Sequence, residues 1–216
     1  MSQPSESPGY PRKRRQTRRR LLRAGMALLA ERGPLGVTAG SIASTAGVAT
    51  GTFYNHFESL DAFFEAVASE LLRGIEIGRD TLTEIEHDPA VRVTIGVLQL
   101  LAMADADPIS ASAFVTLAAT RADFRTKVRA IVAAAIADGV AADRFTAPAG
   151  QAATNAVLGT TLQSMRSRFL GETEPDLAPD VARLVLRLLG VGARSIDGII
   201  GRAIAIATVD AAPSVG

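Results

Sequence analysis

Residues 38–57 read TAGSIASTAGVATGTFYNHF, and this stretch decides the fold. Thr38 has the side chain of a helix N-cap and begins a short helix that Gly47 ends. A second helix is predicted over residues 49–57, because two phenylalanines four residues apart share one inward face. The pattern therefore predicts two helices joined by a tight glycine turn.

The outer face of the second predicted helix carries small and polar side chains. A helix-turn-helix that reads DNA lays this helix in the major groove, which requires close packing between its two helices. Ala43 and Gly47 provide small residues where the two helix backbones approach each other. We therefore interpret the stretch as a DNA-binding helix-turn-helix. Its exposed candidate residues are Thr50, Gly51, Thr52, Tyr54, Asn55 and His56.

The segment ahead of this motif is rich first in proline and then in arginine. Residues 1–11, MSQPSESPGYP, are predicted to form a disordered tail, because they carry too little hydrophobicity to offset the entropy of ordering. A basic run follows and leads into a predicted helix over about residues 14–32, which Gly33 and Pro34 end. Such a run is typical of a solvated helix end, but it also suits DNA phosphates or a minor groove. The candidate contacts are Arg14, Arg15 and Arg18.

The formal net charge of +1 hides a division of the chain. Residues 1–57 hold nine Lys and Arg against only Glu6 and Glu31, a charge of +7, whereas residues 58–216 carry −6. This asymmetry indicates a cationic module that binds a polyanion, joined to a body with another task. We place the cationic domain at residues 12–58.

The rest of the chain has helical patterns and no strand pattern, so the predicted fold class is all-α. Ser59 is a suitable N-cap for a connecting helix over residues 59–86. Residues 87–216 are expected to form a second helical domain, whose last segments, 151–170 and 179–207, are long and apolar. The breakers that separate its segments are expected at residues 105–108, 138–139, 146–150 and 171–179.

Composition excludes several classes of protein. The chain has no Cys, so it has neither a disulfide framework nor a thiolate metal site. Its longest uncharged apolar run, residues 93–104, is shorter than the roughly 20 residues of a membrane span, and we expect a soluble cytoplasmic protein. No phosphate-binding, dinucleotide-binding, serine-hydrolase or zinc-protease motif is found, so we expect no enzyme and no cofactor. His87, flanked by Glu84, Glu86 and Asp88, is interpreted as a solvated helix end rather than a metal site.

The helix-turn-helix stretch and its flanks carry a specific resemblance. Residues 38–57, the sequence LLRAGMALLAERG at residues 21–33, and the start of the next helix together resemble the DNA-binding domain of the tetracycline-repressor (TetR) family of bacterial transcriptional regulators. The resemblance covers about residues 14–65. The chain departs from the family pattern at three positions: Leu60 and Thr50 replace frequent lysines, and Gly25 replaces a usual alanine.

The resemblance implies roles for the residues that open the two short helices. Thr38 matches a capping position that touches a phosphate, although an ordinary cap explains it equally well. Thr50, Gly51 and Thr52 open the recognition helix and are expected to contact bases or phosphates.

Three further positions of the recognition helix follow from the same resemblance. Tyr54 and His56 match positions that donate to phosphates. Asn55 matches a variable position and suits either an adenine edge or solvent. In a dimer, two such helices would enter successive major grooves about 34–36 Å apart on a near-palindromic operator.

For the second domain, the resemblance implies dimerisation and ligand binding. The homodimer is expected to form through residues 151–170 and 179–207. An uncharged or weakly polar, mainly apolar effector is expected to bind a pocket, although each apolar candidate also suits plain core. The candidates are Leu98, Met103, Phe114, Leu117, Phe124, Phe145, Leu162, Met165 and Phe169.

The resemblance favours a repressor that leaves its operator when the effector shifts the connecting helix. Three alternatives stay open. The chain could be an effector-independent DNA-binding protein, an activating one, or a helical interaction scaffold without DNA binding. DNA binding by the intact protein separates the last of these from the others.

Overall fold

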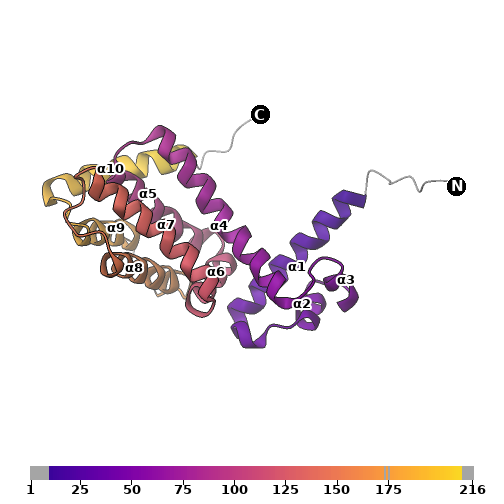
Figure 1. Ribbon diagram of the computed structural model, residues 1–216. Coiled ribbons are helices and arrows are strands. Elements are labelled where there is room, and N and C mark those ends of the chain that lie inside the picture. Colours follow the sequence, from indigo (N-terminus) through magenta and orange to yellow (C-terminus); the bar gives the residue numbers. More distant parts are fainter. Residues whose placement is uncertain (1–9, 173, 175, 211–216) are drawn as a thin grey trace. The chain divides into compact units, whose positions relative to one another are not determined.

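The computed structural model describes residues 10–172, 174 and 176–210 (Figure 1). Every regular element in this part of the chain is a helix, so the predicted all-α fold class is confirmed. The chain divides into two compact units, residues 1–70 and residues 71–216, and the boundary lies within the helix α4 (Leu60–Ile85).

The described part of the first unit, from residue 10 on, holds four helices and the beginning of α4. These are α1 (Tyr10–Arg32), the short 3-10 helix η1 (Pro34–Gly36), α2 (Ala39–Thr45) and α3 (Thr50–Tyr54). The helix α1 begins earlier than expected, so Tyr10 and Pro11 are helical where a disordered tail was predicted. Proline is tolerated there because the first turn of a helix leaves its N–H groups unpaired. Residues 1–9 of that tail lie outside the described residues.

The expected caps of this unit are present. The Thr38 hydroxyl accepts a hydrogen bond from Ser41 N at 3.1 Å, and Thr38 N donates to Ser41 Oγ at 2.9 Å, which completes a capping box. Gly47 has a φ of 65° and turns the chain from α2 toward α3. Ser59 Oγ accepts from Ala62 N at the start of α4.

The recognition helix is shorter than the predicted 49–57. It ends at Tyr54, and Asn55 and His56 continue as a turn in which His56 N donates to Phe53 O. This hydrogen bond spans three residues instead of the four of an α-helix. Phe57 still faces inward and is only 4% exposed.

The second unit is built around α5 (Pro89–Ala106). Packed against α5 are α6 (Pro108–Thr120), α7 (Ala122–Ala141), α8 (Gln151–Phe169), α9 (Leu177–Leu188) and α10 (Ala193–Asp210) (Figure 1). Among the described helices, α5 alone has the length and hydropathy of a membrane span, but nearly half of it is buried in this helical core.

Two predicted boundaries in this unit are wrong. The expected break at residues 138–139 lies inside α7, because Gly139 provides the space that the Phe145 ring fills. The expected single segment 179–207 is two helices, α9 and α10. They separate at Gly190, whose φ is 79° and whose carbonyl accepts a hydrogen bond from the Thr146 hydroxyl. A contact with a distant loop therefore decides this break.

Candidate nucleic-acid interface and apolar cavity

The recognition helix α3 has one buried face and one exposed face. Phe53 is fully buried, and the neighbouring Tyr54 is 57% exposed. The six residues predicted for its outer face all reach the surface: Thr50, Gly51, Tyr54 and Asn55 are exposed, and Thr52 and His56 are half-buried. A Cβ atom placed on Gly51 would meet nothing within 4 Å, so this surface is open to a partner.

An aromatic cluster holds this helix from behind. The Phe53 ring lies 5.4 Å from the Phe57 ring and 5.6 Å from the Phe63 ring, between ring centres. Phe63 and Phe57 meet edge to face at 5.0 Å. Because ring pairs of this kind add to the free energy of burial, the cluster fixes α3 against α4.

The arginines in the basic half of α1 fall into two groups: some are exposed, and others contact the helix-turn-helix. Arg14 and Arg15 are exposed, whereas the Arg18 guanidinium lies over the Phe57 ring, 5.1 Å from its centre. Arg20 donates to the carbonyl of Ala46 in the turn between α2 and α3. Arg20 therefore supports the turn of the helix-turn-helix.

His56 shares its surroundings with this basic segment. Partial burial, together with the positive charges of Arg14 and Arg18, lowers the pKa of His56 below its ordinary value of 6.5. The lowered pKa favours the neutral imidazole in the free protein. The surface next to it carries the positive charge that a phosphate would meet.

Thr38 is exposed, but its hydroxyl already takes part in the capping box with Ser41. Thr38 therefore acts as an ordinary helix N-cap, one of the two roles that the sequence suggested for it. The exposed hydroxyl at the start of α2 also keeps the position expected for a phosphate contact.

A cavity of about 450 Å³ lies within the second unit. Its walls come from the second half of α4, from α5, α7 and α8, and from Phe114 of α6, and they are mainly apolar. This size and character are typical of a small-molecule site. Gly74 and Gly96 lie in its lining, and a Cβ atom on either would meet nothing within 4 Å, so the missing side chains contribute to the open space.

Three of the nine predicted pocket residues line this cavity: Met103, Phe114 and Leu162. The other six lie outside its lining. Leu117, Phe124, Phe145 and Met165 are buried core, and Leu98 and Phe169 are half-buried elsewhere. Apolar residues of core and cavity are the same types, so the sequence did not separate them.

Sequence reasoning missed the polar residues of the lining. Arg92, Gln99 and Asp138 line the cavity, together with Gly96. Arg92, Gly96, Gln99 and Met103 recur at spacings of three and four along α5, so a polar interruption on an otherwise apolar helix face was the available signal.

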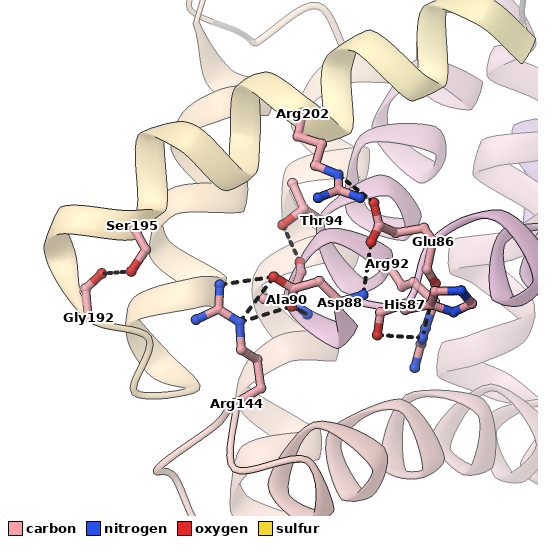
Figure 2. Close-up of polar contacts among 10 residues, drawn as sticks. All are labelled: Glu86, His87, Asp88, Ala90, Arg92, Thr94, Arg144, Gly192, Ser195 and Arg202. Atoms are coloured by element: carbon pink, nitrogen blue, oxygen red, sulfur yellow. Dashed lines mark hydrogen bonds and ion pairs between the residues drawn. The ribbon is translucent and has the colours of Figure 1, made fainter.

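Ion pairs connect the residues just after α4 to the α7–α8 loop and to α10 (Figure 2). Glu86, only 1% exposed, accepts from Asp88 N and pairs with Arg202 of α10, whose Nε lies 2.7 Å from Glu86 Oε2. Arg144 of the α7–α8 loop donates to both carboxylate oxygens of Asp88. Within the part of the chain that the structure describes, no group of three or more His, Asp or Glu could hold a metal ion.

The fold and this surface define the class of protein: a helix-turn-helix DNA-binding domain joined to an all-helical domain with an internal cavity. Residues 21–67 match the family described as bacterial regulatory proteins of the tetR family. The resemblance found in the sequence is therefore confirmed, and residues 21–67 carry the N-terminal domain of the TetR-family regulators. Regulators of this family bind operator DNA, form homodimers and bind small-molecule effectors.

Solved structures share this fold. RolR in complex with the ligand resorcinol is 26% identical, with a TM-score of 0.63 over 89% of this chain and 96% of that chain. A gamma-butyrolactone receptor, an ArpA-like protein, has a TM-score of 0.70 at 16% identity, covering 91% and 99% of the two chains. CprB of S. coelicolor A3(2), a TetR-family protein, has a TM-score of 0.70 at 15% identity, covering 91% and 98%. A sequence search of curated proteins found no match.

Proposed function

We propose that this chain is a cytoplasmic, homodimeric repressor that binds a near-palindromic operator and leaves it when a mainly apolar ligand fills the cavity. The outer face of α3 carries this proposal. Six small or polar residues lie on α3 and on the turn that follows it, and this segment is anchored by a fully buried phenylalanine next to a segment rich in arginine. This is the arrangement that a major groove requires.

The proposed contacts divide by chemistry. Thr50, Gly51, Thr52 and Asn55 would face base edges or the nearby backbone. Phosphates would be met by Thr38, Tyr54 and His56 and by the basic residues Arg14, Arg15 and Arg18. No catalytic role is proposed for any residue.

The proposed dimer uses the exposed sides of the last helices. Leu184 and Leu188 of α9 are 47% and 41% exposed, and Ile204 of α10 is 40% exposed. Gly198 and Gly201 on α10 are also exposed and would let two helices approach closely. We expect residues 151–170 and 179–207 of two chains to pack as a helical bundle.

Release of the operator on ligand binding would act through α4. Residues of α4 between Leu71 and Thr83 line the cavity, and the helix begins at Leu60 in the first unit. Phe63, Phe64 and Val67 are buried on that first part of α4. A ligand that favours a shifted α4 would move these residues and change the spacing of the two recognition helices, at a coupling free energy of about 1–3 kcal/mol. RolR, solved with resorcinol bound, supports a small-molecule ligand for this domain.

The test is a fluorescence anisotropy titration of duplex DNA from immediately upstream of the gene, against a scrambled duplex, at two salt concentrations. We expect the native duplex to bind about a thousandfold tighter, with affinity falling as salt rises. Tyr54→Phe and Thr52→Ala should each weaken this binding, whereas Thr120→Ala in the second unit should not. Equal weak binding of both duplexes contradicts the proposal, and no binding at all favours the helical scaffold.

A further inference from the structure

Arg92 lies in the first turn of α5 and in the wall of the cavity. Its Nη1 donates to the backbone carbonyls of Glu86 and His87, at 3.1 and 3.2 Å, just beyond the last residue of α4 (Figure 2). The side chain is half-buried. The end of α4 therefore holds this guanidinium in place.

The charge of Arg92 is not matched by a carboxylate. Figure 2 shows three arginines around residues 86–88, and two of them pair with acids: Arg202 with Glu86 and Arg144 with Asp88. Among the described residues, no Asp or Glu oxygen lies within the 4.0 Å ion-pair distance of Arg92. A guanidinium has five N–H donors, and only those on Nη1 are engaged.

Arg92 lies one turn from the N-terminal end of the α5 part of this lining. The lining residues of α5 extend from Pro89 to Met103, over about 21 Å of helix axis at about 1.5 Å per residue. Phe114 and Leu162 line the cavity together with Met103. A ligand that fills this space has an apolar body and, near Arg92, a group that accepts charged hydrogen bonds.

We propose that Arg92 binds the carboxylate of an amphipathic monocarboxylic acid whose apolar body occupies the cavity. This inference rests on the proposed ligand-binding function and names the class of ligand. A carboxylate matches the planar fork of a guanidinium and can accept two parallel hydrogen bonds. Asp138, exposed in the same lining, disfavours a second negative charge on the ligand, which is why the acid carries only one.

The position of Arg92 gives such a ligand a direct connection to α4. The same guanidinium would hold the ligand carboxylate and the carbonyls of Glu86 and His87. An alcohol of the same length would fill the cavity without engaging this charge. The difference between acid and alcohol therefore isolates the role of Arg92.

The experiment is isothermal titration calorimetry of the full chain with decanoate and with decan-1-ol, which share the same ten-carbon length. We expect decanoate to bind at least about tenfold tighter than the alcohol, because hydrogen bonds to charged groups are worth more than neutral ones. In Arg92→Gln this ratio should fall to about one, with decan-1-ol affinity unchanged. Arg92→Lys, which keeps the charge without the fork, should give an intermediate ratio.

Two further variants serve as controls. Arg125 also donates to a backbone carbonyl, that of Ala119, but it does not line this cavity, so Arg125→Gln should leave the ratio unchanged. Gly96→Leu adds a side chain to the open space and should weaken the binding of both decanoate and decan-1-ol. Circular dichroism melting of each variant confirms that it is folded.

Equal binding of acid and alcohol to the unaltered chain, or a ratio that persists in Arg92→Gln, overturns the assignment of Arg92 while leaving the cavity a ligand site. If neither decanoate nor decan-1-ol binds, the assignment of Arg92 is overturned as well, together with the proposed apolar ligand. Operator binding, measured separately by anisotropy, decides whether the DNA-binding part of the proposed function stands in each case.

Discussion

Gly25 lies directly against the ring of Phe63: a Cβ atom on Gly25 would come within 2.2 Å of Phe63 Cζ. Phe63 is fully buried and packs with Phe53, Phe57 and Phe64, so its ring cannot easily move aside. In the sequence, Gly25 is only a helix-weakening residue in place of a usual alanine. In the structure, its missing side chain makes room for the aromatic cluster that supports the recognition helix.

Gly25→Ala should therefore destabilise the protein even though alanine favours helix. The gain in helix propensity is about 1 kcal/mol, and overpacking a buried site costs typically 1–3 kcal/mol, so we expect a net loss of about 1 kcal/mol. Urea unfolding measures it. Gly74→Ala, where the added Cβ meets nothing, is the matched control and should stabilise. A stabilised Gly25→Ala variant would show that the Phe63 ring moves freely.

Operator binding should strengthen as pH falls from about 7.5 to 6. Burial and the nearby Arg14 and Arg18 lower the pKa of His56 in the free protein, and a bound phosphate would favour its charged form. The complex then holds more protons than the separate molecules, so affinity rises with acidity, by at most about tenfold per pH unit for one proton. Anisotropy titrations across this range measure the slope.

His56→Gln should remove that pH dependence, while Tyr54→Phe should weaken binding and keep the slope. A pH-independent affinity in the unaltered chain would show that no phosphate lies near His56.

Arg144→Met should lower the free energy of unfolding by about 1–3 kcal/mol at pH 7, because it leaves the half-buried Asp88 carboxylate without its charged partner. Burial acts to raise the pKa of Asp88, but the hydrogen bonds from Arg144 and Ala90 N and the charges of Arg144 and Arg202 outweigh it and hold the pKa below 3.8. This stabilisation is present above the unfolded-state pKa and is lost as pH falls through the folded-state pKa.

The difference between Arg144→Met and the unaltered chain should accordingly shrink from pH 7 to pH 3 in urea titrations. Arg183→Met is the control, because Arg183 pairs with exposed Asp180 and Asp197, and it should show no measurable loss. A pH-independent difference would assign the effect to packing instead.

Gly190→Ala should destabilise the protein more than Gly171→Ala. Both glycines have positive φ, 79° and 75°, so both substitutions strain the backbone by about 1 kcal/mol or more. Only at Gly190 does a Cβ also meet the Thr146 hydroxyl, at 2.0 Å, and the backbone nitrogen of Ala147. Thermal unfolding of the two variants compares them directly, and equal losses would show that the Thr146 loop yields.

Local patterns in the sequence were enough to predict the helix-turn-helix, the charge division and the all-α class. The caps at Thr38 and Ser59 and the turn at Gly47 act within a few residues of one another, so local chemistry encodes them. The same local signals marked the outer face of α3, which the structure places at the surface.

Contacts between distant parts of the chain determine where α9 ends, which residues line the cavity, and what Gly25 and Arg92 do. The break at Gly190 depends on Thr146, far away in the chain, and Gly25 depends on a ring from another helix. The cavity is lined by five helices whose apolar residues are of the same types as the core, so its lining is a property of packing. Residue type and spacing specify a helix face, whereas the contacts between faces specify what that face does.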